Sequence, residues 1–402
     1  MLAPYRKVLA APGALAFSSA GALARLPMSM VTISIVLLVE AVYGSYALAG
    51  QVAAVYTVAQ AVCAPQLAKL VDRYGQARVM RPSLVVAMAG LTGVAVAAML
   101  HGPSWLLYPA AAIAGGTVGS MGALVRSRWN TVVESPSQLH TAYSLESAID
   151  ELVFVVGPVL ATTLAASLSP VAGLLIAILA AAGGGFWFLA QRATEPTPSG
   201  RLTGSDRGSV MRSPGMVIIA VVFIAMGSIF GSIDVSTVAF AEESGAAGLA
   251  GVVLGIFALG SLISGLLYGA REFTMAPWKR FVVGIVLLAV GVSLLILVSS
   301  LWVLAAAGFV AGFAIAPTII TGNALVQQLV APSRLTEGLT WVGTSIGVGF
   351  AIGSSVTGSV VDLHGGHAGY VVTMAAAGVA ALIALSTATV LRRVTTQRRP
   401  VG

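Results

Sequence analysis

Two ionisable residues stand inside long apolar stretches of this sequence, where charges are costly. Arg25 lies in the apolar stretch that begins near residue 13, and Asp234 lies in the one that begins near residue 215. A charged side chain at the centre of a bilayer costs at least about 2.5 to 3.5 kcal/mol on insertion scales, so such residues by default bind substrate, move protons or pair with one another. Arg25 and Asp234 are therefore candidates for substrate or proton binding.

Polar residues follow Arg25 at helical spacing. Met28, Ser29, Thr32 and Val36 share its helix face, and Ser29 and Thr32 give that face the mixed character of a cavity wall. Arg25 could hold an anionic or polar group of a substrate, or pair with a titrating acid. The alternatives are a fixed ion pair with a neighbouring helix, or a helix that begins later and leaves Arg25 near water.

Asp234 lies among small and polar residues in the segment FGSIDVST. A carboxyl group removed from water takes up a proton more readily, whereas a nearby arginine favours the charged carboxylate. An acid and a base that separate and rejoin during a cycle could therefore bind and release protons. The alternative is a solvated helix end, because Glu242 and Glu243 follow within about two turns.

Three further acids stand at the start of the fifth apolar stretch. Glu146 and Asp150 share a helix face, and Glu151 points about 100° away from Asp150. Because Arg126 and Arg128 end the preceding stretch on the same side of the membrane, we predict a structural salt-bridge network of these two arginines with Glu146 and Asp150. Glu151 lies deepest and is a further candidate for substrate or proton binding.

Asn323 and Trp341, in the tenth and eleventh apolar stretches, could complete the binding pocket, although hydrogen bonds between helices explain Asn323 equally well. None of the four histidines falls inside a predicted span, so no histidine proton relay is expected. Cys63 and the scattered histidines offer no cluster of metal ligands, and the sequence has no nucleophile elbow or phosphate-binding loop. We therefore expect no catalytic residue, no metal and no cofactor.

The elements that position these residues are long apolar helices. The chain is 57% hydrophobic and 9% charged, with a mean hydropathy of +0.95, whereas soluble domains are about 25% charged. A helix of roughly 20 residues spans about 30 Å of hydrocarbon. The predicted fold class is an all-α integral membrane protein with twelve transmembrane helices, at 13–39, 46–68, 82–100, 104–125, 148–168, 170–190, 215–240, 246–270, 281–299, 302–326, 338–361 and 369–391.

The basic residues predict the orientation of the chain. Every Lys and Arg except Arg25 falls in one alternating set of gaps between the apolar stretches. Basic loops stay in the cytoplasm, so we expect a multi-pass protein of the inner (plasma) membrane with both termini in the cytoplasm. Its net charge of +7 reflects this topology. The lipid bilayer is a partner and nucleic acid is not expected.

A polar stretch rich in Pro, Gly and Ser runs from Gln191 to Pro214 and is typical of a flexible linker. It divides the chain into an N-terminal six-helix bundle, 1–190, a cytoplasmic linker, 191–214, and a C-terminal six-helix bundle, 215–402. The two halves are weakly similar where the second and eighth spans begin. Such duplication is typical of carriers that expose a central site to each side of the membrane in turn.

The loop after the second span carries a specific resemblance. Its sequence from Ala68 to Arg78, AKLVDRYGQAR, resembles the signature loop of the major facilitator superfamily. With twelve spans, the resemblance covers essentially the whole chain and implies two pseudo-symmetric six-helix bundles around a cavity. It also implies that Asp72, Arg73, Gly75 and Arg78 form a cytoplasmic gate. Two departures are Ala68 in place of the opening Gly, and a basic pair reduced to Arg78.

We therefore predict a secondary active transporter, monomeric and proton-coupled, that exports a small amphipathic or drug-like molecule by alternating access. Exporter motifs are incomplete, because the fourth span has no Arg before Gly115-Gly116 and the fifth keeps little beyond Gly157-Pro158. An importer or facilitator of a polar metabolite, anionic ones included, is the alternative, with Arg25 as its anchor. A receptor or scaffold that binds without transporting is a third reading, because a carrier fold does not guarantee transport. A membrane-embedded enzyme is not expected.

Overall fold

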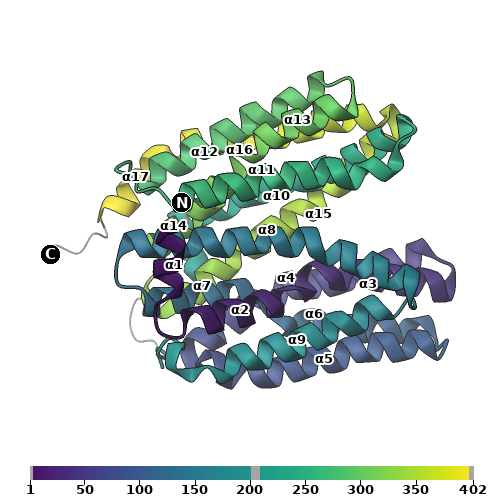
Figure 1. The fold of residues 1–402 in the computed structure, drawn as a ribbon, viewed down its shortest axis with the longest axis horizontal. Coiled ribbons are helices and arrows are strands. Elements are labelled where there is room, and N and C mark those ends of the chain that lie inside the picture. Colours follow the sequence, from purple (N-terminus) through teal and green to yellow (C-terminus); the bar gives the residue numbers. More distant parts are fainter. Residues whose placement is uncertain (1–2, 201–208, 398–402) are drawn as a thin grey trace. The chain divides into compact units, whose positions relative to one another are not determined.

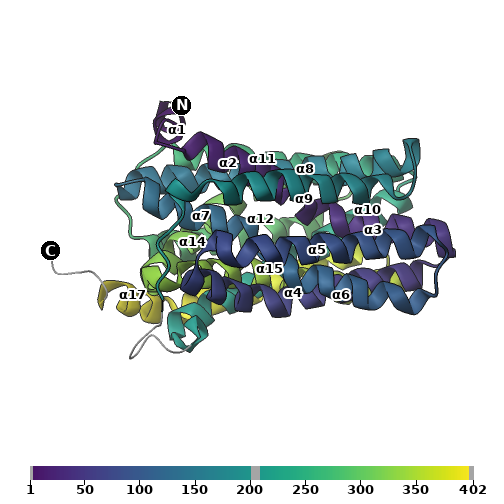
Figure 2. The ribbon, with the colours of Figure 1, turned by 90° about the horizontal axis from the view of Figure 1, so that it is seen from below.

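The computed structural model describes residues 3–200 and 209–397, which form helices joined by short connections and contain no strand. Twelve of its helical segments are long and apolar enough to cross a membrane. Long helices are the structure expected for such apolar stretches. In lipid, where water is absent, a helix forms all its backbone hydrogen bonds within one segment. The predicted all-α fold with twelve membrane spans is confirmed (Figures 1 and 2).

The first six spans are built from α2 (Ala14–Arg25) with α3 (Pro27–Tyr43), α4 (Tyr46–Tyr74), α5 (Gln76–Met99), η1 (Ser104–Leu106) with α6 (Leu107–Val118) and α7 (Met121–Val132), α8 (Pro136–Ser167) and α9 (Ala172–Ala190). The other six are built from α10 (Pro214–Glu243), α11 (Ala250–Gly269), α12 (Pro277–Ser293) with η6 (Leu294–Leu297), α13 (Leu301–Gly312) with α14 (Ile315–Leu329), η7 (Pro332–Arg334) with α15 (Leu335–His364), and η8 (Gly366–Ala368) with α16 (Gly369–Ser386). The remaining described elements are α1 (Ala3–Leu9), η2 (Arg192–Thr194), η4 (Val210–Arg212), η5 (Ala247–Leu249) and α17 (Ala388–Gln397).

Several spans differ from their predicted bounds, and three of the differences matter for the site. The first is interrupted directly after Arg25, because Pro27 has no backbone N–H to continue the helix. The fourth is interrupted at Gly119, where φ is +68°. The fifth begins at Pro136 rather than at residue 148, so the acids predicted at the start of this span lie well inside a continuous helix. Hydropathy missed this part because its polar residues alternate with apolar ones.

The described chain forms two compact units. The N-terminal unit comprises residues 6–135 and 152–200, and the C-terminal unit comprises residues 3–5, 136–151 and 209–397. The helix α8 contributes to both, because residues 136–151 pack with the C-terminal unit. The predicted division at the linker, 1–190 and 215–402, follows the repeat in the sequence and stays a prediction.

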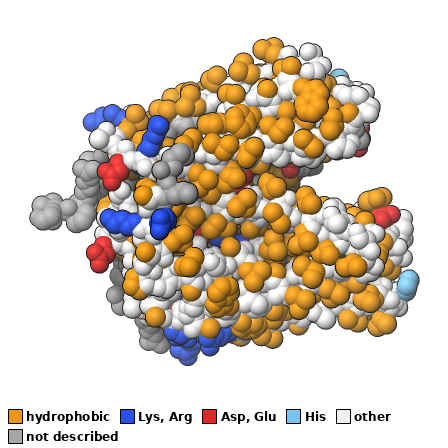
Figure 3. Space-filling model, viewed as in Figure 1, with side chains coloured by type: hydrophobic (Ala, Val, Ile, Leu, Met, Phe, Trp, Pro, Cys, Tyr) orange, Lys and Arg blue, Asp and Glu red, His pale blue; other side chains and the backbone are white. Residues whose placement is uncertain are grey.

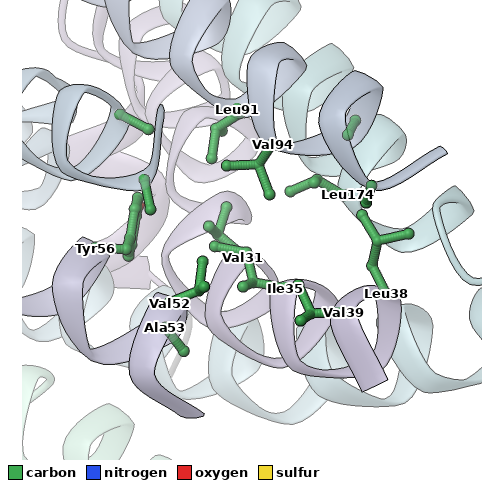
Figure 4. Close-up of a cluster of buried hydrophobic side chains, with 14 of the residues drawn as sticks. Val31, Ile35, Leu38, Val39, Val52, Ala53, Tyr56, Leu91, Val94 and Leu174 are labelled. Carbon is green, nitrogen blue, oxygen red and sulfur yellow. The ribbon is translucent and has the colours of Figure 1, made fainter. Parts of the chain in front are cut away.

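The core of the N-terminal unit is a cluster of buried hydrophobic side chains from α3, α4, α5, α6, α8 and α9 (Figure 4). Val31 and Ile35 of α3 pack with Val52 and Tyr56 of α4 and with Leu174 of α9, and all are almost fully buried. Because lipid tails are as apolar as these side chains, close packing rather than escape from water holds such helices together. The cluster fixes α3, which follows directly on Arg25.

In the C-terminal unit, α10 and α15 cross with their backbones in contact. A Cβ on Gly227 of α10 would collide with the Ile346 carbonyl group, and a Cβ on Gly349 of α15 would collide with the Ile224 carbonyl group. Small residues at a crossing let two helices approach this closely. The crossing fixes the relative positions of Asp234 on α10 and of the α15 side chains that face it.

Hydrophobic side chains cover the lengths of the helices, and Lys and Arg side chains gather at one end of them (Figure 3). We call this end of each unit its basic end. In the C-terminal unit it carries the described basic residues of the connections that precede α10, α12 and α15, of the first turn of α12 and of α17, namely Arg212, Arg271, Lys279, Arg280, Arg334, Arg392 and Arg393. The predicted last span is too long, since α16 ends at Ser386 and α17 follows as a separate helix.

Candidate functional site

Asp234 lines a cavity of about 460 Å³ in the half of α10 that lies farther from the basic end. The cavity lies within the C-terminal unit and opens to the surface. Among the residues that line it, the only ionisable side chains are two acids, and the rest are apolar except for one serine. They are Asp234, Val235, Val238, Ala239 and Glu242 of α10, Leu254 of α11, and Phe350 and Ser354 of α15.

Hydrogen bonds to α16 from residues on either side of Asp234 fix this part of α10. The Ser232 hydroxyl lies 2.8 Å from the Thr373 hydroxyl, and the Thr237 hydroxyl lies 3.0 Å from the Tyr370 hydroxyl, both on α16. Asp234 itself has no hydrogen bond or ion pair to any residue that the structure describes in this unit. The sequence therefore located a carboxyl group that faces a cavity without a protein partner.

Glu151 has a partner that the sequence did not indicate. The Ser261 hydroxyl, on α11, donates a hydrogen bond of 2.6 Å to Glu151 Oε1. Ser261 is fully buried, and a buried hydroxyl bonded to a carboxylate makes a short, strong hydrogen bond. The predicted candidate Glu151 is thus held by α11, in the same unit as Asp234.

Arg25 is fully buried at the last residue of α2, and its Nε donates to the Gly21 carbonyl group at 3.1 Å. The Ser29 hydroxyl donates to the Val153 carbonyl group at 2.8 Å and so links α3 to α8, and its place in the binding site stays a prediction. Thr32 is exposed on the same helix. Arg25 belongs to the N-terminal unit and Asp234 to the C-terminal unit.

Asn323 and Trp341 both belong to the C-terminal unit. Asn323 on α14 is almost fully buried. Trp341 on α15 is half-buried, and its indole N–H is shielded from solvent without a hydrogen-bond partner in the described chain. A shielded donor of this kind is uncommon in folded proteins and is available to a polar ligand. Neither residue lines the cavity around Asp234.

The signature loop connects α4 to α5 through Gly75. Gly75 has a φ of +97°, which only glycine adopts readily, and a Cβ there would lie 2.9 Å from Glu195 Oε1. Glu195 accepts a hydrogen bond of 3.0 Å from the Ala77 backbone N–H at the start of α5 and pairs with Arg192 at 2.7 Å. A carboxylate at a helix N-terminus is stabilised by the free N–H groups and the helix dipole.

The first part of the predicted linker forms hydrogen bonds with this loop. The Asp72 carbonyl group accepts hydrogen bonds from the Ser199 backbone N–H at 2.9 Å and from its hydroxyl at 2.8 Å. The Arg73 carbonyl group accepts from the Gly200 N–H at 3.2 Å, while Arg78 is exposed. The flexibility predicted for the linker stays a prediction. Residues 201–208 lie outside the described part of the chain.

Arg128 holds the same segment from the other side. It donates hydrogen bonds to the Gln76 side chain at 2.8 Å, to the Gln191 carbonyl group at 2.8 Å and to the Thr194 hydroxyl at 2.9 Å, and its guanidinium stacks on the Phe188 ring at 3.8 Å. Its observed partners therefore differ from the predicted ones. Arg126 belongs to the N-terminal unit, and Glu146 and Asp150 to the C-terminal unit. Their network stays a prediction.

The C-terminal end of the linker is anchored by a residue that the sequence analysis missed. Glu337, in the first turn of α15, is buried and pairs with Arg334 at 2.6 Å. It also accepts hydrogen bonds of 3.2 Å from the Ser209 hydroxyl and from the Val210 backbone N–H. A glutamate in the first turn of a helix is a recognisable N-terminal signal. The backbone it would bind could not be read from the sequence.

The start of α8 caps the end of α11, and these residues were also missed. The last carbonyl groups of a helix have no partner within that helix. Here Tyr5 donates to the Leu266 carbonyl group at 2.7 Å, His140 Nε2 lies 3.0 Å from the Tyr268 carbonyl oxygen, and Thr141 donates to the Gly269 carbonyl group at 2.8 Å. A carbonyl oxygen only accepts, so Nε2 of His140 carries a hydrogen. We call this set the α11 cap.

Close packing and one further hydrogen bond support the α11 cap. A Cβ on Gly269 would collide with Ser144 Cβ of α8, so glycine is needed for this approach. The Ser137 hydroxyl adds a hydrogen bond of 2.7 Å to Glu272. His140 lies in the first part of α8, because this helix begins before the polar residues that hydropathy assigned to a loop.

Among the described residues, no group of three or more His, Cys, Asp or Glu side chains could hold a metal ion. The polar groups that the fold brings together are instead carboxylates, hydroxyls and backbone carbonyl groups. Such a set can bind and release protons, bind polar or charged organic groups, and form hydrogen bonds that break when helices move.

Comparisons with known proteins agree with this geometry. The family model of the Major Facilitator Superfamily matches residues 17–283 and 239–401. Comparison with curated protein sequences finds no significant match. Many solved structures share the fold.

Three of these structures, all of transporters, share the fold over nearly the whole chain at low sequence identity. The human organic anion transporter MFSD10 (TETRAN) has a TM-score of 0.72 and 16% identity, covering 93% of this chain and 100% of that one. A bacterial homologue of the iron transporter ferroportin, in an outward-facing state, has a TM-score of 0.72 and 14% identity, covering 94% and 99%. The E. coli fucose:proton symporter FucP has a TM-score of 0.73 and 14% identity, covering 93% and 98%.

At these identities the solved structures establish the fold alone, whereas the family model covers nearly the whole chain. This multi-pass membrane protein belongs to the major facilitator superfamily of transporters.

Proposed function

We propose that the protein is a proton-coupled secondary transporter that exports a small amphipathic molecule by alternating access. The observation that carries this proposal is Asp234, a carboxyl group within a membrane span that faces a cavity and has no partner among the described residues of its unit. A carboxylate without a partner is costly in this setting. It therefore gains by binding either a proton or a positively charged group.

Proton coupling is also supported by the difference between the surroundings of Glu151 and those of Asp234. Glu151 is bonded to a buried hydroxyl of α11, whereas Asp234 is free to exchange its ligand. Two carboxyl groups in different surroundings favour different protonation states. We assign the exchangeable proton to Asp234 and a supporting role to Glu151.

The α11 cap supports alternating access. In the chain order α8 belongs to the first six spans and α11 to the second six, so opening of the protein between these halves at the basic end must break the cap. Its bonds are individually worth about 0.5 to 1.5 kcal/mol, which suits a contact that forms and breaks in each cycle. We propose that it acts with the gate formed by Asp72, Arg73, Gly75 and Arg78.

The proposal also covers the orientation of the chain in the membrane. With the basic ends in the cytoplasm, as the distribution of Lys and Arg favours, the protein lies in the inner membrane as a monomer with both termini in the cytoplasm. The α11 cap then closes the cytoplasmic side. A cysteine label placed at the exposed Arg78 should react only with reagents that reach the cytoplasm.

Transport into proteoliposomes tests the proposal. A thermal-shift screen of the purified protein against metabolites and antibiotics supplies a ligand, whose flux is then measured with and without an imposed pH gradient. We expect a gradient to drive accumulation, and Asp234→Asn to abolish the driven component while retaining exchange. Flux that is indifferent to the gradient would reject proton coupling, and binding without flux would favour a receptor.

A second candidate function is import or facilitated movement of a polar or anionic metabolite. The observation in its favour is that Arg25 and Arg126 both approach Gly122 of α7, where a Cβ would lie 3.7 Å from Arg25 Cδ and 3.1 Å from Arg126 Nη1. Two nearby guanidinium groups concentrate positive charge. If this function holds, Arg25→Ala and Arg25→Lys should selectively lose competition by anionic compounds, whereas an exporter without an anionic substrate should not show this selectivity.

A further inference from the structure

The cavity beside Asp234 has more lining side chains than a proton-binding site needs. Its lining combines two carboxyl groups with apolar and aromatic side chains, and no Lys, Arg or His is among the described residues that line it. A site that only passes protons needs a carboxyl group and water. It does not need a wall of Val235, Val238, Leu254 and Phe350.

The two acids follow one face of α10. Asp234 and Glu242 are eight residues apart, which is slightly more than two helical turns and about 12 Å along the axis. Glu242 is exposed at the end of the helix, and Asp234 lies deeper. The cavity therefore has negative charge at its mouth and at its base, an arrangement that attracts a cation from water and then holds it.

The opposite wall comes from one face of α15. Phe350 and Ser354 are one turn apart and both line the cavity. Phe350 is 40% exposed, so its ring is accessible to a ligand, and a cation over an aromatic face is stabilised by the charge distribution of the ring. The Ser354 hydroxyl oxygen is shielded and has no hydrogen-bond partner in the described chain. It is available to a polar group of the ligand.

Apolar walls select against a hydrated inorganic ion. Divalent cations are bound by several oxygen ligands, and the described residues contain no group of three or more metal-binding side chains. An organic cation satisfies both features, because its charge can pair with Asp234 while its hydrocarbon groups contact the apolar walls. Small-molecule sites commonly combine mainly apolar walls with few polar groups.

From these observations we infer that the cavity between α10, α11 and α15 binds an amphipathic organic cation, whose charge pairs with Asp234 and whose hydrocarbon part packs on Phe350 and Leu254. This inference rests on the proposed function by naming the substrate class of the same site. It also explains how one residue can serve both ligands, because a proton and an organic cation neutralise the same carboxylate and therefore exclude each other.

A pair of probes with the same shape and opposite charge tests the inference. Tetraphenylphosphonium and tetraphenylborate are measured by equilibrium binding to the full-length protein in nanodiscs, with empty nanodiscs as background and no ion gradient. We expect saturable binding of tetraphenylphosphonium only. Asp234→Asn should weaken it at least about 10-fold, the size of one lost charge interaction, whereas Asp234→Glu, which keeps the charge, should retain most of the affinity.

Other variants separate the contributions of the walls and the mouth. Phe350→Leu should weaken binding about 2- to 5-fold, because it keeps an apolar side chain and removes the ring face. Glu242→Gln should slow association more than it weakens affinity, since it lies at the mouth. Asp362→Asn is the matched control, because Asp362 is an exposed acid of α15 that does not line the cavity, and it should bind as the unmodified protein does.

The outcomes distinguish this inference from the proposed function. Equal binding of both probes, no saturable binding of the cation, or binding that Asp234→Asn leaves unchanged in a folded protein would overturn the inference, even if transport proves to be proton-coupled. Conversely, cation binding that depends on Asp234 would support it even if no gradient-driven flux is found, because the binding measurement requires neither flux nor a pH gradient.

Discussion

At the basic end of the C-terminal unit, three side chains satisfy the last carbonyl groups of α11, whereas in the far half of α10 the carboxyl group of Asp234 has no protein partner in the described chain. Both regions lie in the same unit and both place polar groups within membrane spans. The cap pairs neutral groups with one another, and its bonds need no ligand. The cavity holds an ionisable group that has no partner among the described residues and is available to a ligand.

The comparison separates two tasks. A contact that closes one side of a carrier must be stable by itself and weak enough to break, and several neutral hydrogen bonds of about 0.5 to 1.5 kcal/mol each meet both needs. A binding site must instead be incomplete until its ligand arrives, because a carboxylate already paired would have to lose that partner first. The polar side chains of the cap therefore have their hydrogen-bond partners within the protein, whereas the carboxyl group of the cavity obtains its partner from the ligand.

Removing the charge in the cavity should have the largest effect. Asp234→Asn keeps the size of the side chain and removes its ability to exchange a proton, so we expect the proton-linked component of flux to disappear while exchange of bound ligand continues. Proton uptake and ligand counterflow in proteoliposomes measure the two components. Asp362→Asn should leave both unchanged, and full proton-linked flux in the Asp234 variant would remove this residue from the mechanism.

Glu151 offers an intermediate case, a carboxyl group that does have a protein partner. Ser261→Ala removes the donor at 2.6 Å, and a hydrogen bond to a charged group is worth about 1.5 to 3 kcal/mol. We expect a lower thermal midpoint in nanodiscs, with Ser261→Thr restoring most of it. Ser359→Ala is a suitable control, because this exposed hydroxyl bonds only to the backbone of its own helix. An unchanged midpoint would place Glu151 with Asp234 rather than with the cap.

Adding a methyl group to the α11 cap should open it. Gly269→Ala forces Ser144 of α8 away from α11, and overpacking of this kind costs about 1 to 3 kcal/mol. In a Cys63→Ser background, a cysteine placed at the buried Ser147 of α8 should then react faster with an impermeant maleimide applied to the basic side. Gly343→Ala, where a Cβ meets nothing within 4 Å, should not change the rate, and equal rates in both variants would contradict the closing role.

Loss of one bond from the cap should have the smallest effect. Tyr5→Phe removes the hydrogen bond to the Leu266 carbonyl group, about 0.5 to 1.5 kcal/mol, so the same labelling rate should rise by less than about 10-fold. Tyr46→Phe is the control, because Tyr46 is 70% exposed. An increase as large as that of Gly269→Ala would mean that the bonds of the cap act as one unit.

The Tyr5 bond should also be independent of pH over the physiological range. Burial raises the pKa of the Tyr5 hydroxyl from its usual value of 10.0 to about 12. A group whose pKa is raised on folding contributes stability that is fully present below its unfolded value and is lost as the pH rises through its folded value. The effect of Tyr5→Phe on labelling should therefore be the same at pH 6 and pH 8. A difference between them would point to another titrating group in the cap.

Much of the fold followed from patterns that are local in the sequence. Runs of apolar residues marked the spans, and the polar stretch after residue 190 marked the linker. Boundaries failed where a helix continued through polar residues, as at the start of α8, because hydropathy detects contact with lipid and not helix formation. The break after Arg25 was missed in the same way, although Pro27 is a recognisable signal.

The candidate site followed from the sequence only in part. Asp234 and Glu151 were found because charges within apolar stretches are rare, a property that needs no structure. Ser261, Ser354 and Tyr5 were not found, since serines and tyrosines are common in such helices and nothing local separates a packing residue from a partner. The bond of Ser29 to α8 was not found either, because the partner lies more than 100 residues away in the sequence.

The sequence by itself determined that the chain is a bundle of membrane-spanning helices of the major facilitator type, because length, hydropathy and the signature loop are properties of single segments. Only the tertiary structure decided which polar groups are satisfied by the protein and which await a ligand. That distinction depends on the rotation of each helix about its axis and on what the neighbouring helix presents. Neither is encoded in any one segment, and both are set when glycines such as Gly227 and Gly349 let α10 and α15 approach.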